Sequence, residues 1–178
     1  MRRYRIRLAR PDEVGLLPAI ETVAAGLFRD TPYPWVADDP DGMSLALFKE
    51  CQEEWNLWVA ADDGDRPVGF AAYAQFEDQT WLGELSVDPA HARRGLGARL
   101  IEAGAQFYGG RGSPRLTLTT FRDVLWNAPY YTKLNFTVID DLSGEPHLAH
   151  CIEKELARGM PNGSRVAMQR ALAERGTS

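Results

Sequence analysis

Cysteine is scarce in this sequence: Cys51 and Cys151 are the only two, and they do not form a Cys-x-x-Cys pair. Disulfide frameworks and zinc ribbons need several cysteines at short spacing, so both kinds of scaffold are excluded. The chain also lacks an apolar run near the roughly 20 residues that cross a bilayer. Its Arg-rich start has no apolar signal core. We therefore expect a cytoplasmic protein with reduced thiols and no membrane partner.

Basic residues are outnumbered by acidic ones. The chain carries 20 Lys and Arg against 25 Asp and Glu, a net charge of -5. This balance does not build the basic surface that nucleic acids require, so no nucleic-acid partner is expected. The only lysines are Lys49, Lys133 and Lys154, and none follows a glycine. A P-loop needs Gly-Lys-Ser/Thr, so hydrolysis of nucleoside triphosphates is unsupported.

The composition that remains is typical of one globular domain. The chain has 178 residues, of which 44% are hydrophobic and 25% charged, and this length matches a single core of ordinary size. No internal repeat or long linker divides it. We expect one main domain over residues 1–158 and a C-terminal tail over 159–178, with a candidate helix at 165–175.

Hydrophobic periodicity changes several times along the chain and predicts alternating elements. Alternation with a period of two predicts strands at 4–8, 57–61, 67–76, 81–87, 115–121, 136–139 and 148–155. Spacing near 3.6 predicts helices at 12–28, 43–55, 95–108 and 127–135, the last starting at the capping residue Asn127. A turn at 62–65 joins the second and third strands, and the proline-rich segment 30–41 is expected to be a loop.

The stretch from Trp81 to Ala98 predicts an anion site, because a strand and a proline stop lead into a glycine-containing turn that opens a helix. The first N–H groups of a helix lack partners inside it, and Gly95 and Gly97 let a phosphate approach the backbone closely. Arg93 and Arg94 oppose the helix dipole unless an anion lies between them. The alternative is a solvated basic cap on an ordinary helix.

A dinucleotide fingerprint does not fit this turn. Its third glycine would fall at Leu100, and its acidic residue would fall in the segment 115–121, which contains no acid.

Two segments together carry a resemblance to a known family. One is Leu85-Ser-Val-Asp-Pro89 followed by Arg94-Gly-Leu-Gly-Ala98, and the other is Asn127-Ala-Pro-Tyr-Tyr-Thr-Lys-Leu-Asn-Phe136. They resemble the GNAT superfamily of acyl-CoA-dependent N-acetyltransferases: the first is similar to the family's fourth strand and pyrophosphate loop, and the second to its Tyr-x-Lys-x-Gly-Phe segment. The sequence departs from the family at Ala92, where Gln or Arg is usual, and at Asn135, where Gly is usual.

The resemblance implies an α/β fold: a mixed, mostly antiparallel sheet of about seven strands, with helices on both faces and a splayed cleft between strands 4 and 5. It implies acetyl-CoA as co-substrate. The cofactor-binding residues that it implies are Leu85, Ser86 and Val87, which pair with the pantetheine arm through their backbone, Arg93, Arg94, Gly95, Leu96, Gly97 and Ala98 at the pyrophosphate, and Asn127 near the pantetheine or thioester.

Amide formation needs a neutral amine, and an ammonium of pKa about 10.4 is neutral in only about one part in 2,500 at pH 7. Glu84 is our candidate base, because it lies in the strand implied to border the thioester and shares a face with Ser86. The alternative is an ion-paired glutamate at the surface. Tyr131 matches the family's tyrosine acid, which protonates the departing thiolate, whereas a purely buried aromatic role suits Tyr130 better.

The acceptor site is less well determined by the sequence. Seven aromatic and acidic side chains are candidates for attracting a cationic amine, or else belong to a solvated surface. They are Tyr33, Trp35, Asp38, Asp39, Asp41, Glu77 and Asp78. His147 and His150 lack partner ligands in a zinc pattern, so no metal is expected. Neither cysteine lies beside a histidine in a supportive pattern, which favours direct attack by the amine.

The expected function is transfer of an acetyl group from acetyl-CoA to a primary amine of a small molecule or peptide. A non-catalytic acyl-CoA-binding or interaction module of the same fold is the alternative. The segment after Arg158 is a candidate contact for a homodimer. Donors such as succinyl-CoA or propionyl-CoA stay open, as do the acceptor and the oligomeric state, because a fold does not fix them.

Overall fold

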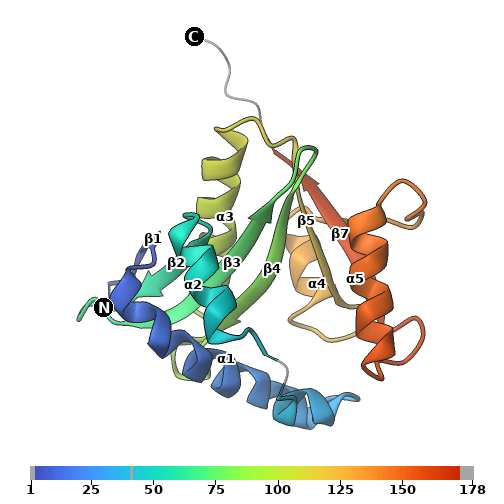
Figure 1. Ribbon diagram of the computed structural model, residues 1–178. Coiled ribbons are helices and arrows are strands. Elements are labelled where there is room, and N and C mark those ends of the chain that lie inside the picture. Colours follow the sequence, from blue (N-terminus) through green and yellow to red (C-terminus); the bar gives the residue numbers. More distant parts are fainter. Residues whose placement is uncertain (1–2, 41, 173–178) are drawn as a thin grey trace. The chain divides into compact units, whose positions relative to one another are not determined.

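The computed structural model describes residues 3–40 and 42–172. Seven strands form one sheet in the order β1-β2-β3-β4-β5-β7-β6 (Figure 1). They are β1 (Arg5–Leu8), β2 (Leu57–Ala61), β3 (Pro67–Gln75), β4 (Thr80–Val87), β5 (Arg115–Phe121), β6 (Thr137–Val138) and β7 (Arg165–Ala171). The β4–β5 pair is parallel, whereas β1–β2, β2–β3, β5–β7 and β6–β7 are antiparallel. The predicted mixed, mostly antiparallel sheet is confirmed.

Five α-helices accompany the sheet within the described residues. They are α1 (Leu17–Ala25), α2 (Leu45–Glu53), α3 (Leu96–Gly109), α4 (Ala128–Lys133) and α5 (Pro146–Ala157). Short 3-10 helices extend or precede them: η1 (Pro11–Leu16), η2 (Gly26–Asp30), η3 (Pro34–Asp38) and η4 (Pro89–His91). None of the helices in the described part of the chain is long and apolar enough to cross a membrane.

The chain divides into two compact units. The first contains residues 1–74 and 82–107, and the second contains 75–81 and 108–178. The printed pairs between β4 and β5, Thr80 with Leu116 and Trp81 with Thr117, both lie in the second unit. Beyond them the two strands belong to different units, and the cleft expected between strands 4 and 5 stays a prediction.

The first unit has helices on both faces of its strands, α1 and α2 on one and α3 on the other (Figure 1). Alternation along β3 explains this. Phe70 and Ala72 pack with Phe48 of α2 in one buried cluster, whereas the Tyr73 hydroxyl on the opposite face donates to the carbonyl oxygen of Leu100 in α3 at 3.1 Å. Helices on both faces of the sheet therefore pack against β3.

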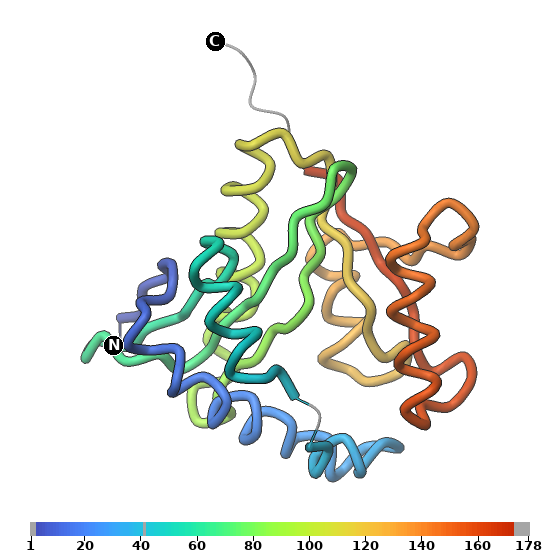
Figure 2. The backbone as a smooth tube through the Cα atoms, in the orientation of Figure 1, coloured from blue at the N-terminus to red at the C-terminus, as the bar shows by residue number. Residues whose placement is uncertain are grey.

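The second unit corrects two expectations. Residues 148–155 are not a strand but part of α5, and residues 165–171 are not helical but form β7 (Figure 2). Residues 173–175 of the expected helix lie outside the described residues. A short apolar run is compatible with the period of a helix or of a strand. Residues 165–171 adopt the strand conformation because β7 is hydrogen-bonded to both β5 and β6.

Candidate functional site

The connection from β4 to α3 is a compact turn held by Asp88. Its side chain accepts a hydrogen bond from the backbone N–H of Ala90 at 2.8 Å and so caps η4. Its own N–H donates to the carbonyl oxygen of Val68 at 2.9 Å, which ties the end of β4 to β3. The turn that follows therefore starts from a fixed point in the sheet.

The backbone between η4 and α3 has the shape of an anion-binding turn. Arg93 has φ 58° and Gly95 has φ 71°, both in the left-handed region, and α3 begins at Leu96. Left-handed residues in a turn direct successive N–H groups toward one concavity, and the helix that follows adds its positive end. A non-glycine residue in this conformation is strained by about 1–2 kcal/mol. Strain at Arg93 is typical of a functional turn.

Glu84 and Ser86 lie on one face of β4, as the sequence predicts. The Ser86 hydroxyl donates to Glu84 Oε1 at 2.8 Å. Ser86 is buried and Glu84 is half-buried. The carboxylate is therefore held by a neighbouring donor on a rigid strand.

A second carboxylate, Glu21 on α1, was missed by the sequence analysis. Its two oxygens accept from the backbone N–H of Met43 at 3.0 and 3.2 Å. Burial and then the charge of Glu84 raise the pKa of Glu21 to about 7. Hydrophobic periodicity indicates only that Glu21 lies next to the buried Ile20 in a helix. It does not indicate the contact with Met43, which is distant in sequence.

Tyr131 is buried, with 9% of its surface exposed, whereas its neighbour Tyr130 is half-buried. The expectation that burial suits Tyr130 better is therefore wrong. The Tyr131 ring makes edge contacts with Tyr130 and with Phe136, both at 5.6 Å between centroids. Asn135 has φ 65° and closes the helical segment, so this departure from glycine keeps the left-handed end.

Asn127 starts α4, but its side chain does not cap the helix. Its Oδ1 instead accepts from the Thr120 hydroxyl of β5 at 3.1 Å. Its Nδ2 is buried and has no hydrogen-bond partner among the described residues. A buried amide donor without an acceptor costs about 1–3 kcal/mol, which marks this atom as a candidate ligand contact.

Two of the acidic residues expected at the acceptor site form ion pairs within the chain. Asp38 pairs with Arg29 at 2.6 Å, and Asp78 pairs with Arg115 at 3.0 Å. The Tyr33 and Trp35 rings meet edge to face at 5.7 Å, with Trp35 44% exposed. Asp39 of the same loop is half-buried, and Asp41 lies outside the described residues.

Cys151 lies beside a histidine, which corrects the expectation from the sequence. Its Sγ is 3.6 Å from His147 Nε2, one turn earlier on α5. Burial raises the pKa of the Cys151 thiol and lowers the pKa of His147. Both shifts favour the neutral forms, so the pair does not store a reactive thiolate. In the described part of the chain, no group of three or more His, Cys, Asp or Glu side chains is arranged to hold a metal ion.

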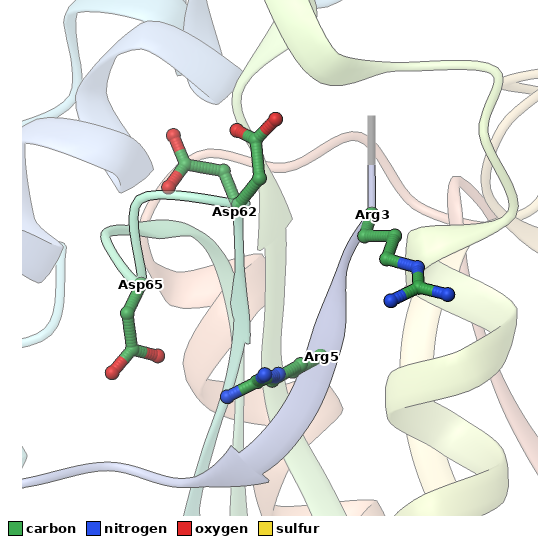
Figure 3. Close-up of a pocket in the computed structure, with 5 residues that line it drawn as sticks. Arg3, Arg5, Asp62 and Asp65 are labelled. Carbon is green, nitrogen blue, oxygen red and sulfur yellow. The ribbon is translucent and has the colours of Figure 1, made fainter. Parts of the chain in front are cut away.

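A pocket of about 140 Å³ lies apart from the predicted site residues, in the first unit. Figure 3 shows Arg3 and Arg5 on one side of it and Asp62 and Asp65 of the β2–β3 turn on the other. Asp65 also bonds to Arg7 at 3.1 Å. The pocket is therefore lined by charges of both signs.

Comparison with known proteins identifies the family to which the chain is similar. The family model described as the acetyltransferase (GNAT) family matches residues 23–136. A mycothiol acetyltransferase from Nocardioides sp. is 34% identical over 119 residues, covering 61% of this chain and 36% of that protein. The chain thus spans about a third of the length of that curated relative.

Solved structures share the fold. The PaiA N-acetyltransferase from Thermoplasma acidophilum, solved in complex with coenzyme A, aligns with a TM-score of 0.70 and 14% identity over 95% of this chain and 99% of that one. The ribosomal-protein-S18-alanine N-acetyltransferase from Escherichia coli gives 0.66 and 18% over 99% and 98%. With the family model matched across the strand, turn and helix of the predicted anion site, the chain belongs to the GNAT acetyltransferase family.

Proposed function

We propose that this chain transfers an acetyl group from acetyl-CoA to a primary amine of a small molecule or peptide, by direct attack of the amine on the thioester. The observation that carries the proposal is the turn before α3, where Arg93 and Gly95 are both left-handed and the helix end follows. An acetyltransferase of this family must bind the pyrophosphate of its co-substrate, and such a turn can do so.

The residues present fit coenzyme A. Backbone N–H groups of the segment from Arg93 to Ala98, including Gly95, Leu96 and Gly97, hold the pyrophosphate with help from the Arg93 and Arg94 guanidinium groups. The backbone of Leu85, Ser86 and Val87 pairs with the pantetheine arm as an added strand would. The Asn127 Nδ2 atom, buried without a partner, donates to a carbonyl oxygen of that arm.

Glu84 prepares the amine. At pH 7, leaving an ammonium of pKa about 10.4 unassisted adds roughly 4.6 kcal/mol to the barrier. Glu84 takes the proton directly or through a water, and the Ser86 hydroxyl, 2.8 Å from Glu84 Oε1, keeps the carboxylate in one orientation. Orientation matters here because proton transfer requires hydrogen-bond geometry.

Tyr131 completes the reaction. A phenol with an ordinary pKa near 10 is protonated at neutral pH, so its hydroxyl can donate as the thiolate of coenzyme A departs. The rings of Tyr130 and Phe136, each 5.6 Å from that of Tyr131, restrict its rotation. The electron pair of the broken carbon–sulfur bond stays on sulfur and takes up this proton.

The proposal is tested by release of coenzyme A, followed with a thiol-reactive dye. The acceptors are polyamines, aminoglycosides, amino acids, N-terminal and lysyl peptides, and the substrate of the related mycothiol acetyltransferase, each against a blank without acceptor. We expect amine-dependent release with one class. Tyr131→Phe should lower kcat by about 100-fold with unchanged affinity for acetyl-CoA, and Tyr130→Phe is the matched control.

Two results would contradict the proposal. Binding of acetyl-CoA without turnover across the whole panel would favour the non-catalytic module. Equal losses in Tyr130→Phe and Tyr131→Phe would remove the assigned acid.

A further inference from the structure

Tyr4, immediately before β1, contacts the anion-binding turn through its side chain. Its hydroxyl lies 3.0 Å from Nδ1 of His91, and the two rings meet edge to face at 5.8 Å between centroids. The guanidinium carbon of Arg94 lies over the Tyr4 ring, 5.7 Å from its centroid. A residue some 90 positions away in sequence thus contacts His91 just before the turn and Arg94 within it.

The backbone of Tyr4 adds a separate link. Its carbonyl oxygen accepts a hydrogen bond from Arg99 Nη2 in the first turn of α3 at 2.8 Å. This bond does not depend on the tyrosine side chain. Substitutions at position 4 therefore leave one anchor of the chain in place and remove the others selectively.

The side-chain contacts limit the freedom of an exposed arginine. Arg94 is exposed, and a free arginine on a surface loses considerable rotamer entropy when it is fixed on an anion. A cation over an aromatic face is attracted by the ring quadrupole within about 6 Å. Because Tyr4 already holds the guanidinium near the turn, Arg94 loses less side-chain entropy when an anion binds.

We propose that Tyr4 is a positioning residue for the acetyl-CoA site, holding Arg94 and the His91 turn in the geometry that binds the pyrophosphate. This inference rests on the proposed function, because it assumes that the turn binds coenzyme A. Tyr4 does not touch the reacting atoms, so it acts on affinity for the co-substrate and leaves the chemical step unchanged.

The test compares Tyr4→Leu with Tyr4→Phe in the full chain, using acetyl-CoA titration for Kd and steady-state kinetics for kcat and KM. Tyr4→Leu removes the ring and the hydroxyl, and we expect Kd and KM to rise about three- to tenfold with kcat unchanged. Tyr4→Phe keeps the ring under Arg94, so the rise should be only about twofold. A merely structural role of Tyr4 would not produce this split between KM and kcat.

A double-mutant cycle supplies the second readout. The effect of Tyr4→Leu on Kd should shrink in an Arg94→Gln background, because the stacked guanidinium is already gone. It should stay nearly the same in an Arg93→Gln background, which is the matched control because the cation over the Tyr4 ring is Arg94.

The outcomes separate the inference from the proposed function. If the wild-type protein does not bind acetyl-CoA, the proposed function itself is wrong, and if it binds but Arg94→Gln leaves Kd unchanged, the role given to Arg94 and Tyr4 is wrong. If Arg94→Gln weakens binding but Tyr4→Leu does not, only the role of Tyr4 is wrong. Should Tyr4→Leu fail to fold, as thermal unfolding would show, Tyr4→Met takes its place, because it also removes the ring under Arg94, and an unchanged Kd there would overturn the inference.

Discussion

The Ser86 hydroxyl donates to the Glu84 carboxylate, with 2.8 Å between Oγ and Oε1, and both residues lie on β4 of the first unit. A hydroxyl donor at this distance fixes the orientation of the carboxylate. The carboxylate of the proposed base is thus held in one orientation on a rigid strand.

Glu84→Gln should lower kcat by about 100-fold at pH 7 with an amine acceptor, because the side chain keeps its shape but no longer accepts a proton. The loss should shrink as the pH rises, since the neutral fraction of an amine grows tenfold per pH unit below its pKa. Ser86→Ala is the comparison, with a smaller loss. A Glu84→Gln defect that is equal at pH 7 and pH 9 would contradict the base role.

Glu21 predicts a pH dependence of stability. Burial and the charge of Glu84 raise its folded-state pKa from 4.5 to about 7. The stability associated with the protonated form is therefore fully present below about 4.5 and is lost as the pH rises through about 7. Allowing for partial exposure, the loss is on the order of 2 kcal/mol.

Chemical denaturation of wild type and Glu21→Gln between pH 4 and pH 8 measures this effect. The variant should show a flatter profile and gain stability relative to wild type at pH 8. Glu53→Gln, an exposed change on α2, should follow wild type. Parallel profiles for wild type and Glu21→Gln would show that Glu21 does not titrate in this range.

The unpartnered Nδ2 atom of Asn127 predicts an effect on the co-substrate. Asn127→Asp keeps an acceptor for the Thr120 hydroxyl, 3.1 Å away in the wild type, and replaces the amide donor with an oxygen. We expect Kd for acetyl-CoA to rise about tenfold, because an acceptor then faces a carbonyl oxygen. Thr120→Val, which leaves the donor in place, should change Kd less. Wild-type affinity in Asn127→Asp would exclude this contact.

Cys151 should be dispensable. Although its Sγ lies 3.6 Å from His147 Nε2, burial raises its pKa and keeps the thiol protonated, and the nucleophile in covalent catalysis is the thiolate. Cys151→Ser should keep kcat within about twofold. The intact mass of the enzyme after incubation with acetyl-CoA and no acceptor provides the check, and an acetyl adduct on Cys151 would overturn direct attack.

Local signals predicted most of the fold. The strand at 115–121 and the turn at 62–65 were predicted correctly because alternation and turn residues act locally. The segments 148–155 and 165–171 were assigned the wrong conformation, since each is short and its state depends on pairing. In β7, both neighbours come from distant parts of the chain, and no local pattern encodes them.

The candidate site was predictable to the same extent. The turn at Arg93 and Gly95 has a sequence signature, and its left-handed backbone agrees with it. Tyr4 and Glu21 have none, because their roles depend on contacts with His91 and Met43, 87 and 22 positions away. Such relationships come from tertiary packing, which a single sequence does not display.

Transfer of the acetyl group to an amine is most directly tested with acetyl-CoA labelled isotopically in its acetyl group. The labelled co-substrate is incubated with the wild-type protein and the acceptor that supports release of coenzyme A, and the products are analysed by mass spectrometry. We predict that the label appears in an amide of the acceptor and that Tyr131→Phe slows its appearance about 100-fold. Label recovered only as free acetate, or retained on unreacted acetyl-CoA bound to the protein, would contradict the proposed transferase activity.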